Sequence, residues 1–362
     1  METKNEVDRT PNGVTEPPKQ KGNRLLIFGG IAAAIVVVLA LALGLGLGLG
    51  LRKSSSSGAS PLTTTTPSST PSLSTSYKAN PADYVLSPSF NTQAANTTRY
   101  YTFNLTELPD GAPDGVAVRM LLINDQFPGP LVEVNEGDRI ICQVNNFMTV
   151  PTTIHWHGQY QNGTNFMDGT SGISQCPIQP NSTYTYNFTF TQSGTYWYHA
   201  HWSTTYQDGL FGPLIIHGRD EPNYNVDGDM IMMVDDWYHD FSLDLLPGFF
   251  APGNEGVEPV PDNGLINGLN VFDCDNAPGY TCDNSTDTYA TFNITTGGRY
   301  RFRVINTGAF ADFKISIDNH SMEVLSYTVP SNIRLFKPME LHWNQLSSTL
   351  FPSMSLKDTI SF

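Results

Sequence analysis

His155-Trp156-His157-Gly158 and His199-Ala200-His201 are two His-x-His pairs that begin forty-four residues apart, and each lies in a segment predicted to be a β-strand. Side chains at positions i and i+2 of a strand point to the same face. Each pair therefore presents two imidazoles side by side, and two neighbouring strands can bring four together. Imidazole binds copper, zinc, iron and nickel, and four imidazoles without a carboxylate or thiolate favour copper. One pair alone fits an ordinary half-exposed strand, but two pairs predict a metal site.

Short segments of alternating apolar and polar residues surround these pairs, and Gly, Pro, Asn and Asp clusters separate them. Examples are residues 116–123, 139–144 and 184–190. No long 3.6-residue period appears, so the sequence predicts an all-β fold built from a sandwich. This first sandwich is expected to end near residue 218. A second should begin with the apolar run 229–237.

Further motifs accompany the pairs along the chain. They are Asn124-Asp125-Gln126-Phe127-Pro128-Gly129-Pro130, Glu136-Gly137-Asp138, Met167-Asp168-Gly169, Gln175-Cys176-Pro177-Ile178, Gly194-Thr195-Tyr196-Trp197-Tyr198 and Asp208-Gly209-Leu210-Phe211-Gly212-Pro213. In this order they resemble the first domain of a multicopper oxidase, the family of laccases, ascorbate oxidases and iron oxidases. The resemblance covers roughly residues 83–324. It implies tandem cupredoxin-like Greek-key sandwiches, of which the second mainly supports the first.

The resemblance also implies roles for individual residues. The family reduces O2 at a cluster of three coppers held by eight histidines, four of them from the first domain. Carried over by position, His155 would bind the type 2 copper, and His157, His199 and His201 would bind the two type 3 coppers. Asp168 matches a carboxylate that hydrogen-bonds near the cluster and supplies protons. An ordinary turn aspartate is the alternative for Asp168.

The other half of the family's ligand set is not found in the sequence. The chain has eight histidines, and the four outside the pairs are isolated: His217, His239, His320 and His342. No Cys adjoins a His, whereas the family ties its type 1 copper to the cluster through a His-Cys-His motif in a third domain. We therefore expect an incomplete chain that does not complete the oxidase cycle alone.

The function implied is that of a laccase-like enzyme, which oxidises phenolic or related donors by one electron and reduces O2 to water. Iron(II) oxidation is the first alternative. Asp236 stands where iron oxidases carry a glutamate that contacts Fe(II) and where laccases commonly have Asp, so it is a candidate substrate-side carboxylate. A copper-binding ectodomain without enzymatic activity is the alternative from another class.

Four cysteines are too few for a disulfide scaffold in a chain of 362 residues. Cys274 and Cys282 flank a short polar loop, and a local disulfide between them suits an oxidising compartment. Cys176 resembles a family cysteine that bridges to the second domain, so its pairing with Cys274 or Cys282 is the competing connectivity. Cys142, in an alternating strand, is expected to be a buried apolar residue.

Charge and hydropathy indicate where the chain resides. Its net charge of −15 argues against nucleic acid or anionic lipid as a partner. Residues 25–51 are uncharged and apolar, long enough to span a bilayer, and predict a signal anchor, with a cleaved signal as the alternative. The flanking basic residues place the N-terminus in the cytoplasm. The body is then extracellular or lumenal.

Eight Asn-x-Ser/Thr sequons after the apolar run fit a glycosylated body. They begin at Asn96, Asn104, Asn162, Asn181, Asn187, Asn284, Asn293 and Asn319. The predicted order is a disordered tail (1–24), the anchor (25–51), a Ser/Thr/Pro-rich stalk (52–82), a first cupredoxin domain (83–218), an incomplete second one (219–330) and an aberrant tail (331–362).

The aberrant tail is predicted because the resemblance stops after Val324. The family pattern leads us to expect a D-G-T turn and then a strand ending near Q-R-Y. Residues 338–346, back-translated and read in another frame, can encode D-G-T-A-L-E-P, and the same frame can continue to Q-R-Y. The hypothesis is that an intron is read through over about residues 324–337 and shifts the frame. A sandwich that lost its closing strands would expose unpaired edges.

Overall fold

The structure is a computed structural model that describes residues 75–317, 320 and 322–325, together with the backbone of 354–355. All of them lie in the unit Ser69–Phe362. The predicted N-terminal tail, the anchor and residues 52–74 of the stalk fall outside the described residues, as does most of the predicted aberrant tail. Within the described ranges, no helix combines the length and the apolar character needed to cross a membrane.

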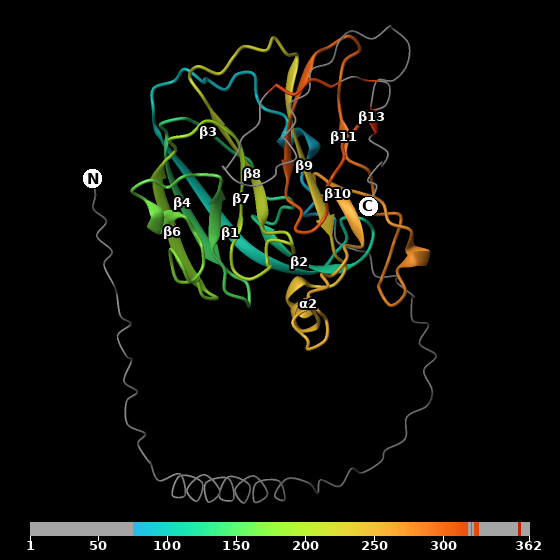
Figure 1. Ribbon diagram of the computed structural model, residues 1–362. Helices are drawn as coiled ribbons and strands as arrows, with labels where there is room; N and C mark the ends of the chain where they lie inside the picture. Colours follow the sequence, from blue (N-terminus) through green and yellow to red (C-terminus); the bar gives the residue numbers. More distant parts are fainter. Residues whose placement is uncertain (1–74, 318–319, 321, 326–353, 356–362) are drawn as a thin grey trace, which may run out of the picture. The chain divides into compact units, whose positions relative to one another are not determined.

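The described chain is mostly β, which confirms the predicted all-β class (Figure 1). Up to residue 217 its elements are η1 (Pro81–Tyr84), β1 (Thr98–Gly111), β2 (Val118–Ile123), β3 (Val132–Asn135), β4 (Arg139–Asn146), β5 (Ile154–His157), η2 (Asn165–Met167), β6 (Ser182–Thr189), β7 (Gly194–Ala200) and β8 (Phe211–His217). Beyond it come β9 (Gly228–Trp237), α2 (Ser242–Phe249), β10 (Asn263–Ile266), η3 (Cys274–Asn276), β11 (Thr291–Phe292), β12 (Tyr300–Asn306) and β13 (Met354–Ser355).

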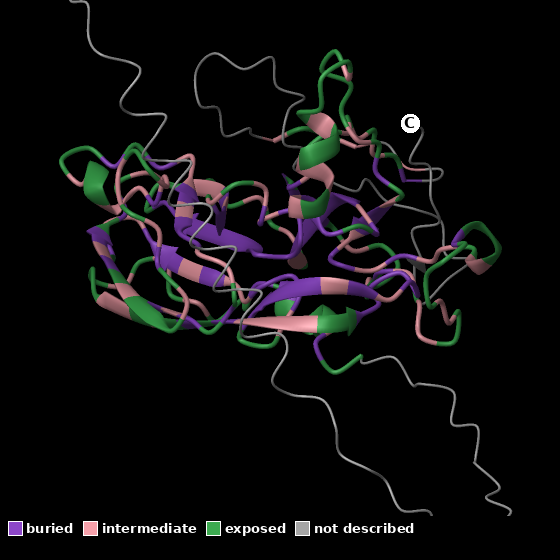
Figure 2. Cartoon of the chain, turned by 90° about the horizontal axis from the view of Figure 1, so that it is seen from below, coloured by how far each residue is buried: buried purple, intermediate pink, exposed green. Residues whose placement is uncertain are grey.

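Two four-stranded sheets form the first sandwich. Their strand orders are β2-β1-β4-β6 and β3-β8-β7-β5. Alternation along each strand sends one set of side chains inward, as in β4, where Ile140, Cys142 and Val144 are buried between more exposed neighbours. The inward residues of both sheets make one hydrophobic core that includes Trp156, Tyr186 and Tyr198. Buried residues accordingly gather on the strands (Figure 2).

A third sheet, with three strands, follows in the order β10-β9-β12. In its parallel pair β9–β12, side chains on both faces are buried, as expected for a covered parallel ladder. One face of this sheet shares a core with β2 and β8, through residues such as Ile231 and Met233 against Phe211 and Ile215. The other face packs within its own cluster around Met232. The two strands β11 and β13 pair antiparallel.

The folded body begins earlier than the predicted boundary at residue 83. Tyr77 is only 2% exposed, and its hydroxyl oxygen accepts a hydrogen bond from the Ala112 amide at 2.7 Å. Asn80 caps η1 by accepting from the Ala82 amide. The last residues of the predicted stalk are therefore part of the body, because an aromatic side chain anchors them in its core.

Charged side chains join the end of β8 to β9 and β12. His217 Nε2 lies 2.9 Å from Glu133 Oε1, and its Nδ1 lies 3.4 Å from Glu221 Oε2. Arg303, which is 2% exposed, donates to Glu221 and to Asp229, both at 3.0 Å. Burial lowers the pKa of His217, but its hydrogen bonds to Glu133 and Glu221 outweigh burial and raise that pKa to about 9. The imidazole is therefore positively charged at neutral pH.

We predict that this imidazolium makes stability depend on alkaline pH. Because the folded pKa of His217 lies above its ordinary value of 6.5, its contribution is complete below pH 6.5 and is lost as the pH rises through about 9. The free energy of unfolding, from urea denaturation at about pH 6 and about pH 9.5, should fall over this interval and fall less in His217→Gln. The same pH dependence in both chains would contradict the assignment.

Candidate metal centre

The two predicted histidine pairs lie on neighbouring antiparallel strands. In the register of β5 and β7, His155 stands opposite His199, and His157 stands opposite Trp197. Trp156 and Tyr198, on the other face of the same strands, are fully buried in the core of the first sandwich. His201 comes directly after the last residue of β7. Alternation thus sends the aromatic residues into the core and the histidines to the opposite face.

The four imidazoles converge. The ring of His155 lies 5.5 Å from that of His157, 5.3 Å from that of His199 and 5.3 Å from that of His201, measured between centroids. Potential ligand atoms of His155, His157 and His199 all lie within 4.8 Å of one another. His201 is the most exposed of the four and stacks on His199 at 5.9 Å. The arrangement can hold metal ions through nitrogen ligands from both strands.

Backbone carbonyls orient two of the rings. His155 Nδ1 lies 2.7 Å from the carbonyl oxygen of Asp168, and His199 Nδ1 lies 2.8 Å from that of Ala200. A ring that donates Nδ1–H to a carbonyl carries its free lone pair on Nε2, which then becomes the metal ligand. These two contacts assign the same tautomer to His155 and His199.

Burial also sets the protonation of the cluster. Loss of water contact, together with the neighbouring rings of His155 and His201, lowers the pKa of His157 to about 4. Burial likewise lowers the pKa of His199 well below its ordinary value. Both rings are therefore neutral at physiological pH, which is the form that binds metals.

The turn that follows η2 supports His155. Asp168 Oδ1 lies 3.4 Å from His155 Nδ1, and the Thr170 hydroxyl donates to Asp168 Oδ2. Burial raises the pKa of Asp168, but hydrogen bonds from His155 and Thr170 outweigh it and hold that pKa below its ordinary value. Gly169 has φ +83°, and a Cβ there would lie 1.8 Å from the carbonyl oxygen of Ile154. The turn can approach β5 this closely only because Gly169 lacks a side chain.

Trp197, which the sequence showed only as part of the motif at residues 194–198, contacts two histidines of the site. Its ring stacks on His199 at 4.1 Å with an interplanar angle of 27° and lies 5.0 Å from the ring of His157. Tyr206 adds a second aromatic ring 5.2 Å from His199. The signal for Trp197 was its position two residues before His199, which places both on one face of β7. Tyr206 lies in a loop, which has no sequence periodicity from which its contact with His199 could be predicted.

Asp236 does not lie at a substrate-side surface in this structure. Its side chain has 0% exposure. Its carboxylate accepts hydrogen bonds from the amides of Ala309, Phe310 and Ala311 at 2.7–2.8 Å and from Gln207 Nε2 at 2.7 Å. With both oxygens occupied by these donors, Asp236 fastens the loop after β12 to the loop after β7. The assignment of Asp236 as a substrate-side carboxylate is corrected accordingly.

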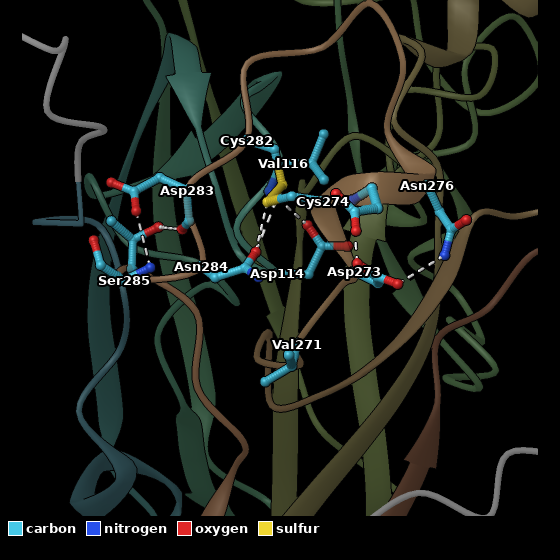
Figure 3. Close-up of a disulfide and its surroundings, with 12 residues drawn as sticks. Asp114, Val116, Val271, Asp273, Cys274, Asn276, Cys282, Asp283, Asn284 and Ser285 are labelled. Carbon is cyan, nitrogen blue, oxygen red and sulfur yellow. Dashed lines mark hydrogen bonds between the residues drawn. A yellow bond between two sulfur atoms is a disulfide. The ribbon is translucent and has the colours of Figure 1, made fainter.

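Of the two disulfide connectivities that the sequence left open, the one between neighbouring cysteines is formed. Cys274 and Cys282 form a disulfide that closes the loop between them (Figure 3), while Cys176 is an exposed free thiol. The alternative pairing of Cys176 with either of them is therefore not formed. Cys142 is buried in the first core, and burial raises the pKa of its thiol well above the ordinary value. Cys142 thus offers no thiolate to a metal.

The donor set fits copper. The ligands are imidazoles, two of them kept neutral by burial, and the carboxylate of Asp168 lies behind a ring nitrogen that already contacts a carbonyl. Nitrogen donors without thiolate or carboxylate in the set suit copper among the common metals.

Comparisons with known proteins agree with this chemistry. Two family models, both described as multicopper oxidase, match residues 106–221 and 228–331. The chain is 40% identical over 256 residues to a protein named Laccase-1 from Cryptococcus neoformans var. grubii, covering 68% of this chain and 40% of that protein. The chain therefore spans about two fifths of the length of this curated relative.

Two further matches come from the same family. The chain is 42% identical over 217 residues to the iron transport multicopper oxidase FET3 from Gibberella zeae, covering 59% of this chain and 32% of that protein. It also resembles the crystal structure of a laccase from Botrytis aclada, with a TM-score of 0.58 and 35% identity, covering 70% of this chain and 46% of that one.

Gly169→Ala is predicted to disturb both the fold and the site. The new Cβ would collide with the carbonyl of Ile154, so the turn carrying Asp168 must move away from His155. Gly172→Ala is a matched control, because Gly172 also has positive φ but open space around it. Urea denaturation should show a loss of about 1 kcal/mol for the control and at least about 2 kcal/mol more for Gly169→Ala. Equal losses of unfolding free energy in the two variants would show that the close approach of this turn to β5 does not contribute to stability.

Trp197→Ala is predicted to weaken copper binding without unfolding the chain. Removing the indole frees the rings of His157 and His199 to rotate, so the copper affinity should fall roughly 10-fold, equivalent to about 1.4 kcal/mol. Trp197→Phe keeps a stacking ring and should retain most of the affinity. Competition with a copper chelator measures both variants. If Trp197→Phe lost as much affinity as Trp197→Ala, stacking would not be the cause.

Proposed function

The chain belongs to the multicopper oxidase family, and from this premise we propose that His155, His157, His199 and His201 hold copper of the type 2 and type 3 classes. The observation that carries this proposal is the convergence of both histidine pairs on one face of β5 and β7. By position, His155 serves the type 2 copper. The other three histidines serve the two type 3 coppers.

Copper at this site would supply the one-electron redox steps that the oxidation of a donor by O2 requires. The residues of the chain prepare the site for those steps. Burial keeps His157 and His199 neutral, and the carbonyls of Asp168 and Ala200 hold two rings in the tautomer whose lone pair is on Nε2. In His199 this nitrogen also lies 3.1 Å from Nδ1 of His157. Asp168 Oδ1, beside the His155 ring, is placed to take up a proton from water and release it near the cluster.

The activity proposed for the working enzyme is that of a laccase: one-electron oxidation of phenolic or related donors, coupled to four-electron reduction of O2 to water. Similarity to proteins named laccase supports this proposal. The sequence carries four converging histidines and no Cys beside a His. We therefore propose that this chain alone lacks the type 1 copper through which the donor's electrons would enter.

Iron(II) oxidation is the second candidate, favoured by similarity to an iron transport multicopper oxidase. The structure does not strengthen it through Asp236, because that carboxylate is buried and fully engaged. A copper-binding ectodomain without turnover is the third candidate. Such an ectodomain would bind copper at the same four histidines but would not oxidise a donor.

We further propose that the body lies on the extracellular or lumenal side of a membrane, behind the anchor at residues 25–51. Exposure of the sequons supports this proposal, because a folded domain can carry glycans only at accessible asparagines. Six of the seven described sequon asparagines are exposed: Asn96, Asn104, Asn162, Asn181, Asn284 and Asn293. Asn187 is half-buried.

The proposal predicts a colourless copper protein. The purified chain should bind copper, and His155→Ala combined with His199→Ala should remove most of it in metal analysis. His320→Ala, outside the cluster, serves as the control for adventitious binding. No intense blue absorption is expected, because that band needs a thiolate ligand in a His2Cys setting. Copper content unchanged in the variant lacking all four histidines would refute the site, and oxidation of a phenolic dye would refute the missing type 1 copper.

A further inference from the structure

A hollow of about 480 Å³ lies beside the loop that follows β5. Its walls come from three places: the loop itself with Gln161 and Asn162, the short helix η2 with Phe166, and the neighbouring strands with Arg139 and Asn187. None of the four cluster histidines lines it. The copper centre therefore does not account for this hollow.

The lining suits a neutral ligand that is rich in hydroxyl groups. Arg139 is the one charged residue in the lining, and its Nε already donates to Asn187 Oδ1 at 2.7 Å. The remaining polar groups are amides and hydroxyls, each able to pair with a sugar hydroxyl. Phe166 is 52% exposed, and an exposed aromatic ring of this kind offers an apolar face for the C–H groups of a sugar ring.

One buried polar atom points to a missing partner. Gln161 is 7% exposed, and its Oε1 accepts from the Thr164 hydroxyl at 2.8 Å. Its Nε2 is buried and has no hydrogen-bond partner among the described residues. A buried donor left unpaired is costly, so a water molecule or a ligand would stabilise this group by supplying an acceptor.

The asparagines of two sequons, Asn162 and Asn187, line this hollow, and they differ in their exposure. Asn187 is half-buried within β6 and is held by Arg139. Asn162 is exposed on a turn in which Gln161 has φ 47° and Gly163 has φ 77°. A Cβ at Gly163 would meet nothing within 4 Å, so the turn is open on this side. Asn162 has the accessible position that a glycan acceptor needs.

We propose that Asn162 carries an N-linked glycan whose first N-acetylglucosamine occupies this hollow, against Phe166 and within reach of Gln161 Nε2, and that Asn187 carries none. In the transfer, Asn162 Nδ2 bonds to C1 of the sugar and loses a proton. The lipid diphosphate of a lipid-linked oligosaccharide leaves from that carbon. The inference rests on the proposed extracellular or lumenal location of the body and is independent of copper.

Mass spectrometry of intact glycopeptides tests the proposal on the full chain from a eukaryotic secretory host. Asn162 is expected to be occupied and Asn187 bare, with exposed Asn104 and Asn181 as internal references for entry into the secretory pathway. Glycan on Asn187 with Asn162 bare would overturn the proposal. So would occupied references beside a bare Asn162, or a chain without any glycan, and the last result would also refute the proposed location while leaving the copper site untouched.

Thermal unfolding tests whether the first sugar fills the hollow. Trimming the glycan to its first sugar should preserve the melting temperature, whereas removing it entirely should lower that temperature by roughly 2–4 °C. Phe166→Ala should lower the melting temperature more in the glycosylated chain than in Asn162→Gln, where no sugar is present. Thr164→Ser keeps the sequon and serves as the matched control. An equal effect of Phe166→Ala in both backgrounds would show that the sugar does not pack on this ring.

Discussion

The antiparallel register between β5 and β7 is the constraint on which the site depends. It sets His155 opposite His199 and His157 opposite Trp197. The same ladder buries Trp156 and Tyr198 in the core on its other face. Because side chains alternate with a period of two, a slip of one residue would exchange the two faces and place imidazoles in the core. The apolar core therefore enforces the geometry of the cluster.

Burial links the stability of the fold to the chemistry of the cluster. Desolvation holds His157 and His199 neutral, and it acts only while Trp197 and Tyr206 cover the rings. Carbonyl oxygens then select the tautomer of His155 and His199. An unfolded chain would supply neither effect, so metal affinity at this site is expected to follow folding.

The three-stranded sheet β10-β9-β12 contributes to the site from a distance. Its residues Ile231 and Met233 share a core with Phe211 and Ile215 of β8, the neighbour of β7. Asp236 at the end of β9 accepts from Gln207, which adjoins Tyr206, and thereby anchors the loop that places Tyr206 beside His199. Asp236, which the family resemblance suggested as a substrate-side carboxylate, therefore supports the site instead. All the hydrogen-bond donors to its carboxylate come from the protein's own loops.

The sequence by itself determined the all-β class, the two histidine pairs and the resemblance to multicopper oxidases, because periodicity and motif spacing are local properties of a chain. Only the tertiary structure decided that β5 and β7 are neighbours, that Cys274 pairs with Cys282 rather than Cys176, and that Asp236 is buried. It also revealed Trp197 and Tyr206 as covers of His199. The pairing of β5 with β7 and the burial of Asp236 depend on contacts between residues distant in sequence, and a local pattern carries no information about which distant partner will close a contact.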